Sequence, residues 1–248
     1  MVHNLGIDGF TIAMFLDCVL HTVDMGVAAR YIGKSFIHGL RSNTFQLTDS
    51  TIGARLEKGM VHLRRGLNVY YKACDKRLGV TKCSRIQQLT LKKLGKPDAP
   101  CLKAKGMQTR NAIGFAVQFM ETASTSAAAT GAQKRIASQL FQAGRHLLRW
   151  FELCEQEKRS FALTDQLALH DACINHLALY EAAGGYMVHK HHGFVHLTDA
   201  VCDFGNPLYF STHFDESENG TCGKICEAVH PRTFAMSGFE RLELSDPK

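Results

Sequence analysis

Three carboxylates lie close together in the last part of the chain. Asp215, Glu216 and Glu218 fall within four residues. Hard oxygen ligands of this kind hold magnesium or manganese in proteins, so the cluster is a candidate site for a divalent cation. Carboxylates are also favoured in the first turn of a helix, where the helix dipole stabilises negative charge. Asp17 and Asp24 would add ligands if the fold brings them to the cluster.

Four histidines form a second candidate site for a metal. They are His189, His191, His192 and His196, and on a helix the first, third and fourth share one face. Imidazole is a common zinc ligand. A helical zinc hydrolase would also carry a glutamate directly after the first ligand, but residues 193–195 are Gly, Phe and Val. The pattern therefore excludes a metalloprotease site and does not favour zinc as a cofactor.

Two cysteines could complete such a zinc site, but their spacing favours packing. Cys222, Ile225, Cys226 and Val229 stand at i, i+3, i+4 and i+7, which is the pattern of a buried helix face. Cysteine behaves there as a small apolar side chain. We expect a helix over about 217–229 with both thiols buried.

Positive charge is concentrated in the middle of the chain. Fifteen of the 29 basic residues lie in 55–110 with only three of the 23 acidic ones, so this segment is +12 and the remainder is −6. Lys and Arg neutralise phosphates and release counterions. We therefore expect nucleic acid, and DNA in particular, as the partner of these residues: Arg64, Arg65, Lys76, Arg77, Lys92, Lys93, Lys103 and Lys105. The alternative is that they solvate exposed helix faces. Tyr70 and Tyr71 could stack on bases, although adjacent tyrosines are more typical of packing.

Two stretches, in order, resemble a known family. Residues 16–27, with Asp17, His21 and Gly26-Val27, resemble the "aspartate, histidine, then Gly-Val" block of CACTA-like DDE transposases and their relatives in cellular genomes. Residues 190–220 hold Lys-His-His, Gly-Asn-Pro and Glu-Ser-Glu-Asn-Gly, and resemble the later "Lys-His-His, Gly-Pro, Glu-x-x-Asn-Gly" portion. Residues 102–110 resemble an intervening segment more loosely.

The resemblance implies a metal-dependent site in the later part of an RNase H-like domain that carries a large helical insertion. Such enzymes bind two divalent metals on three acidic residues and activate water or a DNA 3′-hydroxyl. By position, the resemblance makes Asp17 the second catalytic acid and Glu216 the third, with Asp215 or Glu218 as neighbours. It implies Mg²⁺ or Mn²⁺ on Asp17, Glu216 and Asp215.

Two departures from the family predict an incomplete catalytic site. Asp17 precedes His21 by four positions, one more than the usual spacing, and Cys18 takes the expected aspartate position. Asp8 is the sole candidate for the first acid. We therefore expect a transposase-derived DNA-binding protein, related to a mobile element and inactive by itself. The alternatives are a helical interaction or scaffolding protein with an acidic partner, and an active two-metal nucleotidyltransferase or nuclease.

The elements that must position these residues are mainly helical. Apolar residues recur at helical spacing over residues 12–32, 51–75, 109–120, 133–157 and 164–179, while glycines and prolines break 78–105 into short pieces. We expect a mainly α fold with a small β component, in which an incomplete RNase H-like α/β core carries a large helical insertion. Residues 1–50 form an apolar segment of the core, 51–130 the basic insertion and 131–248 a helical part, within one compact domain; the small-residue tract 123–131 is the expected linker.

The composition and the cysteine spacing predict the cellular location of the protein and the redox state of its thiols. The chain has 248 residues, 45% hydrophobic and 21% charged, which is typical of a globular protein. The sequence shows neither an apolar stretch near the ~18 residues of a membrane span nor a secretory start, and the nine cysteines lack the spacing of a disulfide framework. We expect an intracellular, nuclear protein with reduced thiols and no membrane partner.

Overall fold

Helices dominate the residues that the computed structural model describes, which are 18–49, 51–78, 83–156 and 158–211. The chain divides into two units, Met1–Phe210 and Ser211–Lys248, and the account below concerns the first. Its elements in chain order are a π-helix η2 (Leu20–Ala28), α1 (Ala29–Arg41), α2 (Ile52–Leu78), a 3-10 helix η3 (Leu91–Leu94), β1 (Gly95–Lys96), β2 (Ala99–Pro100), α3 (Gly106–Arg110), α4 (Ile113–Thr125), α5 (Gly131–Cys154), α6 (Leu163–Ala182), α7 (His189–Asp199), α8 (Val201–Phe204) and a 3-10 helix η4 (Pro207–Phe210).

The expectation of a mainly α fold with a small β component is confirmed. In the described residues the two strands are antiparallel, with Gly95 paired to Pro100 and Lys96 to Ala99. Gly95 has φ +81°, a left-handed conformation that glycine adopts without strain. The glycines and prolines of this segment therefore limit it to short elements, as the sequence predicts.

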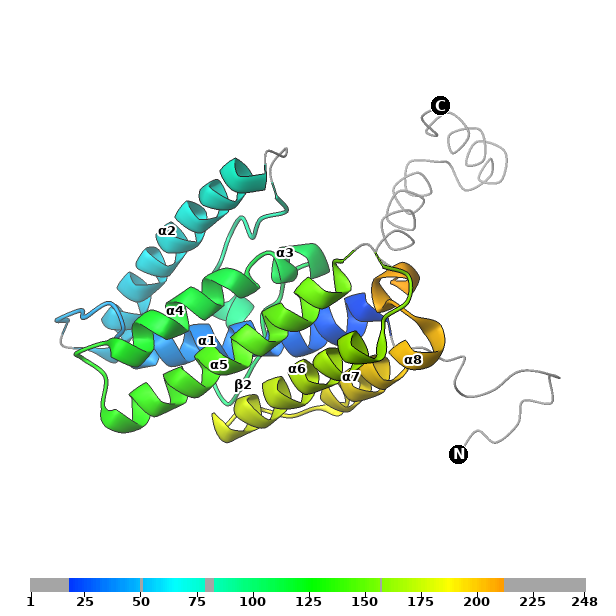
Figure 1. Ribbon diagram of the computed structural model, residues 1–248. Helices are drawn as coiled ribbons and strands as arrows, with labels where there is room; N and C mark the ends of the chain where they lie inside the picture. Colours follow the sequence, from blue (N-terminus) through cyan, green and yellow to red (C-terminus); the bar gives the residue numbers. More distant parts are fainter. Residues whose placement is uncertain (1–17, 50, 79–82, 157, 212–248) are drawn as a thin grey trace, which may run out of the picture. The chain divides into compact units, whose positions relative to one another are not determined.

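Helix α5 lies at the centre of the body, where it packs most extensively against α4 and α6 (Figure 1). Thr130 begins it with a capping box: its hydroxyl accepts from the Gln133 N–H, and the Gln133 amide oxygen accepts from the Thr130 N–H. One face is buried through Leu140, Leu147 and Trp150, and the Trp150 indole donates to the Thr198 hydroxyl of α7 at 3.1 Å. The apolar periodicity of residues 133–157 therefore gave the correct helix.

The expected linker at residues 123–131 is a tight connection instead. Helix α4 continues to Thr125, and α5 begins at Gly131. Ser126 and Ala129 are buried between them. The small side chains let α4 and α5 pack as a helical hairpin, so this tract separates two helices and not two domains.

Two helix starts and one buried face differ from expectation. By its sequence position, Thr109 can cap the helix expected over 109–120, but it lies within α3 and donates from its hydroxyl to the Lys105 carbonyl. Thr164 lies inside α6, which Ala162 precedes as N-cap. Leu167 and Ile174 belong to the apolar set that indicated the helix over 164–179, yet they are 57% and 40% exposed. Helix α6 carries apolar residues on most of its circumference, so periodicity does not select its buried side.

Helix α6 buries another set of side chains: Leu169, Ala172, Cys173, His176 and Tyr180. The pair Gly184-Gly185 predicts the end of this helix, because glycine often follows the last turn of a helix. The prediction is confirmed, since α6 ends at Ala182 and Gly184 has φ +69°. Each helix in the described ranges is too short or too polar to cross a bilayer.

Candidate nucleic-acid interface

Helix α2 has one buried and one exposed side. Met60, Leu63, Leu67 and Tyr71 are buried, and α2 packs through this side against α1. In Figure 1, α2 projects from the rest of the body, so its other side faces outward. The helix predicted at residues 51–75 is thus confirmed, and its charged residues lie opposite a defined packing face.

Three cations share the outer face of α2. Arg65, Lys72 and Lys76 are exposed and stand at i, i+7 and i+11, within about one third of the helix circumference. Arg64 is also exposed, and its Nε donates to the Met60 carbonyl at 3.2 Å. Arg77 lies in the last turn of α2. Lys72 was missing from the predicted set, although its seven-residue spacing from Arg65 indicates the same face.

The other predicted cations follow α2 along the chain and are brought together by the fold. Lys92 and Lys93 lie in η3, and Lys103 and Lys105 precede α3. The Lys103 N–H donates to the Lys93 carbonyl at 2.7 Å, which places the two pairs side by side. Lys92, Lys103 and Lys105 are exposed and Lys93 is half-buried.

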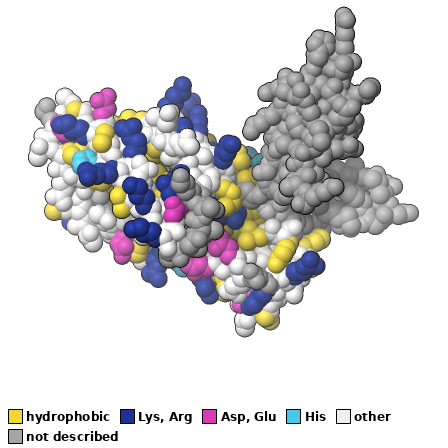
Figure 2. Space-filling view, turned by 90° about the horizontal axis from the view of Figure 1, so that it is seen from above, with side chains coloured by type: hydrophobic (Ala, Val, Ile, Leu, Met, Phe, Trp, Pro, Cys, Tyr) yellow, Lys and Arg dark blue, Asp and Glu magenta, His cyan; other side chains and the backbone are white. Residues whose placement is uncertain are grey.

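An open groove separates α2 from the segment that leads to η3. It has a volume of about 500 Å³. Its lining residues are Glu57, Lys58, Met60, Val61 and Arg64 of α2, and Leu89, Thr90 and Leu91. Figure 2 shows the outer face of this part of the molecule, with more Lys and Arg side chains than Asp and Glu. Two cations of α2, Lys58 and Arg64, therefore line a groove together with Glu57, and its opposite wall continues along the chain into Lys92 and Lys93.

Some cations of the basic segment neutralise carboxylates of the protein itself. Lys58 pairs with Asp49, and Arg85 with Asp75. Arg110 pairs with Asp24, whose side chain is fully buried. Within the described ranges no ion pair engages the following residues: Arg64, Arg65, Lys72, Lys76, Lys92, Lys93, Lys103 and Lys105. Arg55 and Lys96 are likewise in no ion pair among the described residues, so all of these cations remain for an external anion. Because Asp49 and Asp24 lie outside the segment 55–110 and engage Lys58 and Arg110, the external charge of the segment is smaller than +12.

The two tyrosines of α2 both pack against other rings, and Tyr71 is closed to a ligand. Tyr71 is fully buried, and burial raises its pKa to about 12. The Tyr70 ring lies 5.9 Å from that of Phe115, centroid to centroid. The packing interpretation of Tyr71 is therefore correct, and base stacking on it is excluded.

The histidines of the predicted cluster lie on different sides of α7. His191 is buried and stacks on Tyr180 at 5.4 Å between ring centroids. His192 and His196 are exposed, with their Nε2 atoms 2.9 Å apart. In the described part of the chain no group of three or more His, Cys, Asp or Glu side chains is placed to hold a metal ion.

A buried polar cluster was not indicated by the sequence. His176 of α6 stacks on Tyr180 and meets the edge of Tyr31, with ring centroids 6.0 and 5.8 Å apart. Its Nδ1 donates to the Ala143 carbonyl at 2.9 Å. Burial lowers the pKa of His176 to about 4. The cluster joins α1, α5, α6 and α7, and no local sequence pattern reveals such long-range contacts.

The predicted catalytic and metal residues Asp17, Asp215 and Glu216 lie outside the described residues, as do Asp8 and Glu218. The helix expected over 217–229, with Cys222 and Cys226, lies outside them as well. No protein-family model, curated protein or solved structure matches the chain.

Proposed function

We propose that the protein binds nucleic acid, DNA in particular, through the outer face of α2 and the basic residues 92–105. The observation that carries the proposal is the row Arg65, Lys72 and Lys76, which is exposed and, among the described residues, without carboxylate partners. A helix rises about 1.5 Å per residue, so the row spans about 16 Å. Duplex DNA presents about ten phosphate charges over that length.

A transposase origin is part of this proposal. The described residues between Asp17 and Glu216 are mainly helical, and a large helical insertion is what the resemblance implies. The activity retained is DNA binding, which accords with a nuclear location.

A protein partner is the second candidate, and two exposed valines favour it. Val61 and Val69 are 55% and 62% exposed and flank Arg65 on the outer face of α2. Exposed apolar side chains beside cations suit an acidic, partly apolar partner helix. Replacing both valines with serine separates the candidates: it weakens a protein partner but leaves phosphate contacts in place.

The test is duplex binding by the full chain, measured by fluorescence anisotropy at about 50 mM salt. Reversing Arg65, Lys72 and Lys76 to glutamate removes three phosphate contacts and adds repulsion, so we expect a loss of affinity of about 100-fold or more. The matched control reverses three arginines of α5: Arg135, Arg145 and Arg149, which are exposed. Both variants change the net charge by the same amount, so equal losses would show a non-local charge effect and contradict the proposed interface.

A further inference from the structure

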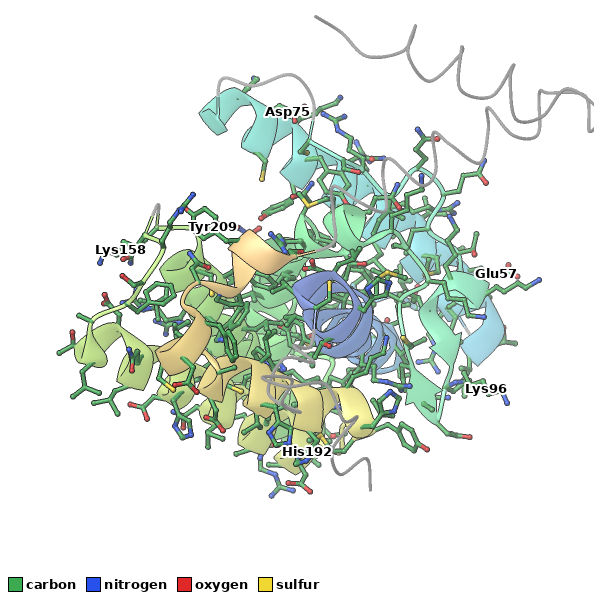
Figure 3. The ribbon with its side chains drawn as sticks, turned by 90° about the vertical axis from the view of Figure 1, so that its right-hand side faces the viewer. Glu57, Asp75, Lys96, Lys158, His192 and Tyr209 are labelled. Carbon is green, nitrogen blue, oxygen red and sulfur yellow. The ribbon has the colours of Figure 1, made fainter. Side chains whose placement is uncertain are left out.

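Two exposed histidines of α7 face each other at metal-chelating distance. His192 and His196 lie on consecutive turns, with Nε2 atoms 2.9 Å apart and ring planes at 75°. At most one proton fits between two nitrogens at this separation, so at least one Nε2 carries a bare lone pair. Figure 3 shows His192 on the side of the body away from Asp75 of α2. The pair is therefore separate from the proposed nucleic-acid interface.

The rest of α7 fixes the position of this pair. The opposite side of the helix is buried through His191, Phe194 and Leu197. Thr198, also buried, accepts a hydrogen bond from Trp150 and donates to the Phe194 carbonyl at 2.8 Å. The backbone that carries both imidazoles is thus anchored in the core, and little reorganisation is needed to bring the two nitrogens to one ion.

The separation of the nitrogens selects a coordination geometry. Imidazole nitrogens bind divalent ions at about 2.0–2.1 Å, and two such bonds to nitrogens 2.9 Å apart meet at about 90°. That is the angle between neighbouring ligands in octahedral and square-planar complexes, the geometries of Ni²⁺ and Cu²⁺. A tetrahedral ion such as Zn²⁺ needs the nitrogens about 3.3 Å apart.

We propose that His192 and His196 form a two-histidine chelate for a divalent transition-metal ion of octahedral or square-planar preference. Water fills the remaining positions, because no third His, Cys, Asp or Glu of the described residues is placed to join the pair. The site is open on one side, as both side chains are exposed. It does not depend on the proposed DNA binding.

Isothermal titration of the full chain with Ni²⁺ tests the site. Ni²⁺ is the probe because Cu²⁺ oxidises thiols, and seven free cysteines lie in the described residues. We expect at least one bound equivalent that is lost in His192→Ala and equally in His196→Ala, since one imidazole alone gives no chelate. His189→Ala is the matched control on the same helix, and it retains that equivalent.

The site is overturned if the native chain binds no Ni²⁺, if either single alanine variant retains every equivalent, or if His189→Ala loses the same one. All three substituted residues, His189, His192 and His196, are exposed on α7, so circular dichroism should be unchanged in the three variants. In a parallel titration, Zn²⁺ should bind to the His192–His196 site more weakly than Ni²⁺. A higher affinity for Zn²⁺ would contradict the geometric argument.

Discussion

Arg110 holds the buried carboxylate of Asp24 with both ends of its guanidinium. Its Nε donates to Oδ1 at 3.0 Å and its Nη2 to Oδ2 at 2.7 Å, between residues 86 positions apart. The guanidinium also lies over the Phe151 ring, 4.7 Å from its centroid. This ion pair ties α3 to η2 and to α5. Because Asp24 engages Arg110, this last cation of the segment 55–110 stabilises the fold and does not contribute to the basic surface.

Breaking this pair should destabilise the fold strongly. Asp24→Asn removes the buried carboxylate that accepts two hydrogen bonds from the largely buried Arg110 guanidinium, which is expected to reduce the free energy of unfolding by about 3 kcal/mol or more. Asp49→Asn breaks the exposed pair with Lys58 and should change the free energy of unfolding by less than about 1 kcal/mol. Urea denaturation measures both, and equal effects would mean that the buried pair contributes little.

The contact of Tyr31 with Gly144 should be sensitive to a single methyl group. A Cβ placed at Gly144 would overlap the Tyr31 hydroxyl and Val117, so Gly144→Ala should reduce stability by about 1–3 kcal/mol. Tyr31→Phe removes the hydroxyl and should restore part of that loss in the double variant. Gly131→Ala, whose Cβ meets nothing within 4 Å, is the control. Failure of Tyr31→Phe to compensate, measured by thermal unfolding, would contradict the proposed contact.

The sequence predicted helices better than it predicted contacts. Periodicity over 51–75 and 133–157 gave α2 and α5, because a long helix that packs one face repeats its apolar residues at a fixed spacing. It also gave α6 from the apolar residues over 164–179, but it did not indicate which side of α6 is buried, because the apolar residues lie nearly all round that helix. The Arg110–Asp24 pair joins residues far apart in sequence, and neither residue type nor local spacing specifies such a pair.

The candidate interface was partly predictable for the same reason. Charge counting identified the basic segment, and seven-residue spacing from Arg65 adds Lys72. Counting could not show that Lys58, Arg85 and Arg110 are engaged by carboxylates of the protein, because that depends on tertiary structure.

Stability should fall as the pH falls below neutrality. Burial lowers the pKa of His176 from its ordinary 6.5 to about 4, so the unfolded chain takes up a proton below pH 6.5 that the folded chain takes up only near pH 4. The folded state therefore loses stability across this window, by up to about 3 kcal/mol from His176 alone. Burial lowers the pKa of three other histidines in the same direction: His38, His146 and His191.

The variant His176→Asn isolates the contribution of His176 to the pH dependence of stability. The asparagine amide can still donate to the Ala143 carbonyl but does not titrate. Denaturation midpoints between pH 7.5 and 4.5 should depend less on pH in this variant than in the native chain. An opposite contribution comes from Glu155, whose pKa burial raises, and it is common to both proteins. An unchanged pH slope in His176→Asn would show that His176 is not the group responsible.

The purified chain is expected to show no magnesium- or manganese-dependent cleavage or joining of DNA. Two divalent cations about 4 Å apart repel strongly, and only several converging carboxylates offset that repulsion. Cys18 stands where the transposases that residues 16–27 resemble have an aspartate, so a thiol replaces one of the expected carboxylates. Plasmid and hairpin DNA in manganese provide the assay. Activity that disappears in Glu216→Gln would establish an enzyme, whereas a contaminating nuclease would survive that substitution.

The salt dependence of DNA affinity tests the central claim most directly, because counterion release counts the phosphates that the protein neutralises. If about six are contacted, the logarithm of the association constant should fall against the logarithm of salt concentration with a slope of roughly −5. Replacing Arg65, Lys72 and Lys76 with alanine should bring the slope to roughly −2 to −3, since each lost contact removes about 0.9. A slope near zero in the native chain, or one that the three substitutions leave unchanged, would contradict nucleic-acid binding by the outer face of α2.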